Sequence, residues 1–165
     1  MATPAATAPA PETGTHDPLA VEAQLCLATS AAARALVGLY RSLLDPLGLT
    51  HPQYLAMLAL WQHGDLSLKE LATVLQLDAA TTSPLVRRLE MLGLVTRRRS
   101  STDERLLVIA LTDDGRAMRA DAVGIPAAMV DRLGLSRETL DEIRSGVETL
   151  LDACRRATQE AGRAS

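Results

Sequence analysis

The sequence is poor in aromatic residues and in cysteine. Among its 165 residues there is no Phe, one Trp and two Tyr, and the two Cys lie far apart. A core without Phe has to be built from Leu, Ala, Val and Ile, which suits helices more than sheets. Two distant Cys argue against a small disulfide-stabilised scaffold.

Long apolar segments are also missing. No run reaches the roughly 18 apolar residues that a membrane-spanning helix needs. The first residues are rich in Ala, Pro and Thr, and they lack the basic start and apolar centre of a secretory signal. We therefore expect a cytoplasmic protein with a disordered tail over residues 1–16 and a single domain over residues 17–165.

The remaining composition is that of a globular domain. Hydrophobic residues make up 47% of the chain and charged residues 22%, which excludes disorder throughout. The formal net charge is -3. An acidic total does not exclude nucleic-acid binding, because the distribution of charge decides that.

Helical patterns dominate the chain. The Ala- and Leu-rich stretch from Leu19 to about Leu44 follows a capping Asp17–Pro18 pair. Residues 67–70 form a capping box for a short helix, and Asp78 can cap the next one. Pro84 then requires either a later start or a kink. Further helices are expected over about 50–63, 68–75, 79–92, 113–123 and 136–161.

Two β-favouring runs, beginning at Leu94 and Leu107, flank a charged loop over residues 97–105. The predicted fold is mainly α with a small β-hairpin wing, a winged helix-turn-helix over residues 50–111. Dimerisation helices over 17–45 and 113–161 flank it. A chain this short cannot bury both long helices against one small domain. We therefore expect a homodimer in which the terminal helices of two chains bury their apolar faces against each other.

Positive charge gathers in the second helix of this motif and in the wing. The segment from residue 87 to residue 105 carries a net charge of +3 inside a chain of -3. Its basic residues are all Arg, a side chain suited to phosphates and base edges: Arg87, Arg88, Arg97, Arg98, Arg99 and Arg105. The pattern favours DNA binding, and the plainer alternative is a solvated surface.

Short hydroxyl side chains begin the predicted recognition helix. Thr81, Thr82 and Ser83 can bond phosphates or bases, although a role confined to the helix start would also account for them. In the wing, Arg105 can enter a narrow minor groove, and Asp103 can hold its orientation. The alternative for that pair is an exposed ion pair of little energetic value.

The wing carries a family signature. Asp103-Glu104-Arg105, followed by Leu111-Thr112 and Gly115, resembles the wing of MarR-family regulators. The resemblance implies a dimeric winged-helix repressor on a pseudo-palindromic operator, with its first and last helices at the dimer interface. It also implies DNA contacts from the following positions: Thr81, Thr82, Ser83, Arg88 and Arg105.

Cys26 lies within the first predicted helix, where a free Cys is usually a small buried hydrophobe. Tyr40 suggests another role. At about 100° and 1.5 Å per residue it falls on nearly the same helix face, yet about 21 Å away. Across a dimer axis, the Tyr40 of one subunit can meet the Cys26 of the other. A phenol donating to sulfur stabilises the thiolate, which peroxides oxidise to sulfenic acid.

A closer resemblance supports this role. The segments that carry it include Leu25-Cys26, Leu43-Leu44-Asp45, Pro52-Gln53-Tyr54-Leu55 and Leu60-Trp61. They are similar to OhrR-type repressors, the branch of the family that senses organic hydroperoxides. The resemblance implies that Cys26 is the peroxidatic residue, that the partner's Tyr40 bonds it, and that Tyr54 lies near the pocket. His51 and Ser30 stand where the branch has Tyr.

His51 can donate a bond to the sulfur, or favour the thiolate if charged, or be a surface residue at a helix start. Cys154 lies on the apolar stripe of the last helix, where a core position is expected. A low-molecular-weight thiol would then react with oxidised Cys26. A disulfide between Cys26 and Cys154 of two subunits stays open.

Three other functions are weighed against a hydroperoxide-sensing repressor. One is a repressor released by a reversibly bound phenolic or anionic ligand, with no redox role for Cys26. Another is a thiol peroxidase, which the absence of a phosphate loop, a metal-ligand spacing and a nearby base argues against. The third is a helical interaction module that does not bind DNA. We expect no enzyme, cofactor or metal.

Overall fold

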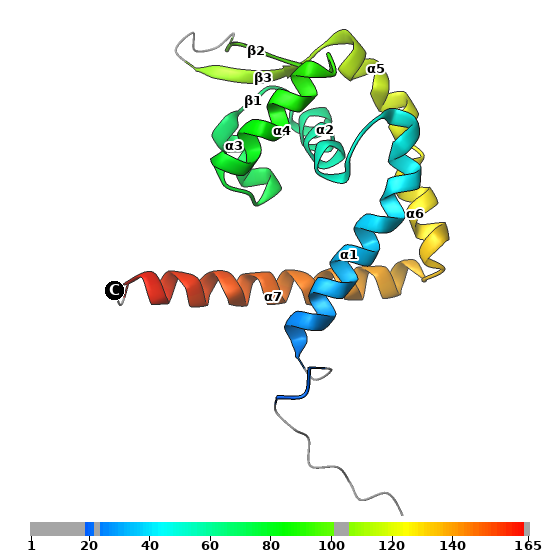
Figure 1. Cartoon of the computed structure of the whole chain (residues 1–165), viewed down its shortest axis with the longest axis vertical. Helices are drawn as coiled ribbons and strands as arrows, with labels where there is room; N and C mark the ends of the chain where they lie inside the picture. Colours follow the sequence, from blue (N-terminus) through cyan, green and yellow to red (C-terminus); the bar gives the residue numbers. More distant parts are fainter. Residues whose placement is uncertain (1–18, 22–23, 101–105, 164–165) are drawn as a thin grey trace, which may run out of the picture. The chain divides into compact units, whose positions relative to one another are not determined.

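A computed structural model describes residues 19–21, 24–100 and 106–163 (Figure 1). The chain forms two compact units, one ending at Val37 and the other beginning at Gly38. Among the described helices, none combines the length and apolar character that a membrane span requires.

The first helix, α1 (Leu25–Leu44), begins later than predicted. The side-chain amide of Gln24 donates to the carbonyl of Ala20, and its backbone N–H donates to Val21. These bonds close a turn in place of the expected helical start near Leu19. The expected cap at Asp17 and Pro18 lies outside the described residues.

The helices at the centre of the chain agree with their predicted caps. A short 3₁₀ helix, η2 (Asp45–Leu47), ends at Gly48 and is followed by α2 (His51–His63). In α3 (Leu68–Leu75), the backbone N–H of Glu70 donates to the Ser67 hydroxyl and the Ser67 N–H donates to the Glu70 carboxylate. These elements and α4 (Ala79–Met91) enclose an aliphatic core that includes Leu44, Met57, Leu60, Leu71, Val86 and Leu89.

The recognition helix α4 (Ala79–Met91) runs continuously through Pro84. The alternative of a later helix start is therefore wrong. Proline has no N–H, so the helix gives up the bond that residue 84 would donate to the carbonyl of Ala80. The cap at Asp78 and the packing of Leu85, Val86 and Leu89 into the core hold the helix despite this loss.

The predicted hairpin is confirmed, with two corrections. Strands β2 (Val95–Arg99) and β3 (Leu107–Leu111) pair antiparallel, and Arg97, Arg98 and Arg99 continue the ladder and do not belong to a loop. A third strand, β1 (Leu66–Ser67), completes a sheet of order β1-β3-β2. Its two residues carry no alternating pattern, so only their pairing with β3 makes them a strand.

Three helices follow the sheet: α5 (Asp113–Ala122), α6 (Ile125–Leu133) and α7 (Arg137–Arg163). The predicted helices leave residues 124–135 without an element, and α6 occupies most of this stretch. Pro126 lies in the first turn of α6, where a missing N–H costs no helical bond. No side chain of α7 within the described residues is buried.

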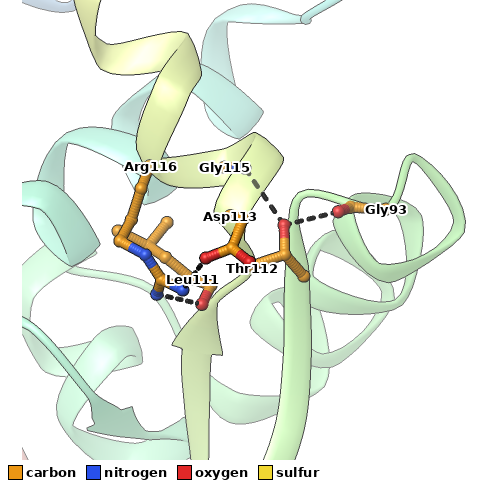
Figure 2. Close-up of polar contacts among 6 residues, drawn as sticks. All are labelled: Gly93, Leu111, Thr112, Asp113, Gly115 and Arg116. Atoms are coloured by element: carbon orange, nitrogen blue, oxygen red, sulfur yellow. Dashed lines mark hydrogen bonds and ion pairs between the residues drawn. The ribbon is translucent and has the colours of Figure 1, made fainter.

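A polar junction joins the wing to α5 (Figure 2). The Thr112 hydroxyl donates to the carbonyl of Gly93 at 2.6 Å and accepts from the N–H of Gly115 at 3.0 Å. The Thr112 N–H donates to the carbonyl of Leu94. The start of α5 is thereby fixed against the turn that connects α4 to β2.

Candidate functional site

The N-terminus of α4 is held by Asp78. Its carboxylate accepts a 2.6 Å hydrogen bond from the backbone N–H of Thr81, and this bond lowers the pKa of Asp78. The Thr81 side chain is exposed and that of Ser83 is half-buried. Both hydroxyls therefore remain accessible at the end of the helix that meets a DNA groove in helix-turn-helix proteins.

Thr82 does not belong to this surface, contrary to the sequence prediction. Its side chain is fully buried, and its hydroxyl donates to the carbonyl of Asp78 at 2.7 Å. A buried hydroxyl that bonds one helical turn back closes the helix start and offers nothing to DNA. The alternative role weighed for the three hydroxyls is thus correct for Thr82.

The arginines of α4 and β2 lie on neighbouring elements. Arg87 and Arg88 are exposed on α4, and the guanidinium of Arg97 lies 3.3 Å from the Glu90 carboxylate. A surface hollow of about 460 Å³ spans the two elements, and its lining consists of Ser83, Pro84, Arg87, Glu90 and Arg97. The packing of β2 beside α4 therefore gathers predicted DNA-binding residues from both.

The other wing arginines differ in their surroundings. Arg98 makes a 2.5 Å ion pair with Asp65, which lies between α2 and β1, and Arg99 is exposed. Arg105 and Asp103 lie outside the described residues. Asp65 is not among the predicted site residues, because nothing in the sequence indicates that β1 brings this carboxylate beside the hairpin.

Three of the predicted sensor residues come together where α1 ends and α2 begins. The ring centroids of Tyr40 and His51 are 4.8 Å apart, and those of Tyr40 and Tyr54 are 5.9 Å apart. We call these three residues the aromatic cluster. Tyr54 is buried and the other two are half-buried. His51 is the first residue of α2, as its helix-start alternative expects, and its ring also packs against Tyr40.

Burial shapes the ionisation of the aromatic cluster. It raises the pKa of Tyr40, and together with the neighbouring Tyr40 phenol it raises the pKa of Tyr54. Burial also lowers the pKa of His51. Near neutral pH, all three side chains are therefore uncharged groups that can donate a hydrogen bond.

Both cysteines are exposed in the single chain. Neither the interpretation of Cys26 as a buried hydrophobe nor the expected core position of Cys154 holds there. Apolar neighbours on the same helices are exposed as well, including Leu25 on α1 and Ile143 and Val147 on α7. Among the described residues, no group of three or more His, Cys, Asp or Glu is arranged to hold a metal ion.

The comparison with known proteins identifies the family. The sequence profile of the MarR family matches residues 49–107, which include the helix-turn-helix and most of the wing. The chain is also 41% identical over 136 residues to the organic hydroperoxide resistance transcriptional regulator of Bacillus subtilis, covering 82% of this chain and 92% of that protein. The chain belongs to the MarR family.

Solved structures agree with this MarR-family fold. Reduced AbfR bound to DNA is 28% identical, with a TM-score of 0.66, over 79% of this chain and 91% of that one. AbfR comes from Staphylococcus epidermidis, and it has also been solved in a disulfide form. CouR of Rhodococcus jostii RHA1, bound to p-coumaroyl-CoA, is 24% identical with a TM-score of 0.69 over 80% and 94% of the two chains, and shows the shared fold.

Membership in the MarR family decides the class of function. This MarR-family chain is a transcriptional regulator and not an enzyme. The thiol peroxidase and the helical interaction module are therefore excluded.

Proposed function

We propose that the chain is a homodimeric repressor that releases operator DNA when an organic hydroperoxide oxidises Cys26. The observation that carries the proposal is the aromatic cluster, in which Tyr40, His51 and Tyr54 pack together. The identity of 41% to the B. subtilis regulator of organic hydroperoxide resistance supports the same function.

The proposal of DNA binding rests on the arginines of α4 and β2 and on the accessible hydroxyls of Thr81 and Ser83. We assign DNA contacts to Thr81, Ser83, Arg87, Arg88, Arg97 and Arg99, and we retain Asp103 and Arg105 from the sequence analysis. A dimer presents this surface twice, which matches a pseudo-palindromic operator. The DNA complex of AbfR, at 28% identity, supports this use of the fold.

Dimerisation is supported by the exposed apolar side chains of the terminal helices. α7 is 27 residues long, and its described side chains are all exposed or half-exposed. Leu25 is 62% exposed on α1 and Ile143 is 51% exposed on α7. Burying such side chains against a second chain is the usual way to stabilise long amphipathic helices. The helical spacing then brings Cys26 of one subunit to Tyr40 of the other.

The chemistry begins with the Cys26 thiolate. The sulfur attacks the hydroxyl oxygen of the hydroperoxide, the O–O bond breaks, and the alkoxide takes a proton from water to leave as an alcohol. Sulfur is oxidised to sulfenic acid and the peroxide is reduced. A low-molecular-weight thiol then forms a mixed disulfide and releases water. The partner's Tyr40 and neutral His51 stabilise the thiolate by donating hydrogen bonds.

A second function is favoured by a hollow of about 370 Å³ between α2 and the α5–α6 segment. Its apolar lining includes Tyr54, Leu58 and Trp61, and Arg119 contributes one cation. These groups suit a phenolic or anionic ligand that releases the repressor without oxidation of Cys26.

The test is a gel-shift on DNA from around the gene, at fixed salt, with and without cumene hydroperoxide. We expect oxidant to abolish binding and dithiothreitol to restore it. Cys26→Ser should bind DNA normally and ignore oxidant, while Cys154→Ser serves as the matched control and should respond like the parent chain. Oxidant-insensitive binding by the parent chain would reject the redox mechanism and leave the ligand-released repressor.

A further inference from the structure

The arginines of β2 are held on opposite faces of the sheet. Successive strand residues point to opposite faces, so Arg97 and Arg98 diverge. Arg97 meets Glu90 of α4, whereas Arg98 meets Asp65, on the turn between α2 and β1. β2 is therefore tied by one ion pair to the recognition helix and by another to the opposite edge of the sheet.

The register shows how far Arg98 reaches. Ser67 of β1 lies opposite Val108 of β3, and Val108 lies opposite Arg98 of β2. Asp65 precedes Ser67 by two residues. The Arg98 side chain therefore reaches past β3 to the Asp65 carboxylate, with an N–O distance of 2.5 Å. Two strand spacings amount to about 10 Å, so this pair depends on the long side chain of Arg98.

This geometry distinguishes Arg98 from the other predicted DNA-binding arginines. Its guanidinium lies 2.5 Å from the Asp65 carboxylate, a closer pair than Arg97 makes with Glu90 at 3.3 Å. A phosphate contact would have to compete with that carboxylate. The pair instead joins the strand that leads into the wing tip to the first edge of the sheet, where β1 is only two residues long.

We infer that Asp65 is a positioning residue for DNA binding, because it holds Arg98 across the sheet and so fixes the orientation of the wing. The inference rests on the DNA binding proposed above. It assigns Arg98 to the positioning of the wing and not to a phosphate contact.

A phosphate contact by Arg98 and a positioning role for the Asp65–Arg98 pair predict opposite changes in DNA affinity for Asp65→Ala. Removing a negative charge near bound DNA strengthens binding if Arg98 is thereby freed for a phosphate. If Asp65 positions the wing, the same change weakens binding by about two- to fivefold, the range expected of one exposed ion pair. The slope of log K against log salt should stay unchanged, since no phosphate contact is lost.

The measurement is fluorescence anisotropy with a short duplex selected by the parent chain from random DNA, over a range of salt concentrations. Asp131→Ala is the matched control, because it removes the same charge from an exposed position on α6, away from the sheet. It should bind as tightly as the parent or slightly more tightly. The exchange variant Asp65→Arg with Arg98→Asp keeps the net charge and should regain most of the lost affinity.

A readout without DNA separates this inference from the proposed function. Backbone amides of β2 should exchange hydrogen faster in Asp65→Ala than in the parent, while those of α2 should not change. A parent chain that binds no duplex would reject the DNA-binding proposal, whereas the exchange rates would still test the link between Asp65 and β2. Unchanged or tighter DNA binding by Asp65→Ala would overturn the positioning role.

Discussion

The indole N–H of Trp61 on α2 donates a 2.8 Å hydrogen bond to the carbonyl oxygen of Gly115 on α5. The N–H of Gly115 in turn donates to Thr112, whose hydroxyl donates to Gly93. These bonds connect the helix that carries His51 and Tyr54 to the turn that ends the recognition helix. The junction is therefore a place where small changes should have measurable effects on stability.

Trp61→Phe keeps an aromatic ring on α2 but removes its N–H donor. We expect the free energy of unfolding to fall by about 1 kcal/mol, the usual net value of one hydrogen bond, with some further loss from the smaller ring. Urea unfolding followed by circular dichroism, at one protein concentration, measures this change. A variant as stable as the parent would show that water replaces the indole without cost.

Gly115→Ala should be more damaging. A Cβ at this position would lie 2.0 Å from the carbonyl oxygen of Leu94, and that backbone oxygen cannot rotate away as a flexible side chain would. We expect a loss of about 2 to 3 kcal/mol in the same urea experiment. Gly124→Ala is the control, since its added Cβ meets nothing within 4 Å. Equal stability of the two variants would contradict the close contact.

Gln76→Gly should stabilise the protein. Gln76 has φ of 57° in the turn between α3 and α4, a left-handed conformation that glycine adopts without steric cost. The free energy of unfolding should rise by about 0.5 to 1 kcal/mol. Gly93→Ala, at φ of 74°, makes the reverse change and should lower it. Thermal melts measure both changes. Melting temperatures that shift in the same direction in the two variants would contradict the prediction.

His51 should make stability depend on pH. Because burial lowers the pKa of His51 in the folded chain, the unfolded chain binds the proton more readily. The contribution of neutral His51 to the free energy of unfolding is fully present above about pH 6.5, which is the pKa of His in the unfolded chain. It is lost as the pH falls through the lower pKa of His51 in the folded chain. Urea midpoints between pH 5 and 8 test this. His51→Gln should flatten the dependence, and a slope equal to that of the parent would contradict the role of His51.

Local signals were enough to predict most helices. The Ser67–Glu70 capping box and the Asp78 cap place α3 and α4 correctly, because such bonds involve residues three apart in sequence. Features that depend on distant partners were not predicted. β1 becomes a strand only by pairing with β3, and the arginines of β2 extend a ladder that their charge does not suggest.

In the candidate site, too, local signals were predictable from the sequence and contacts between distant residues were not. Helical spacing indicates Tyr40, and the family resemblance adds His51 and Tyr54; the fold packs the three together. Thr82 was assigned to DNA because sequence does not show which hydroxyl bonds back to the preceding turn. Asp65 was missed altogether, since its partner is 33 residues away.

Trp61 is the only tryptophan in the chain. Emission excited at the red edge of the absorption band, where tyrosine does not absorb, therefore reports on a single location. That location is the contact of α2 with α5, so a displacement of either helix would change the colour or intensity of the light without any attached dye. The protein thus carries its own optical probe at the contact of α2 with α5.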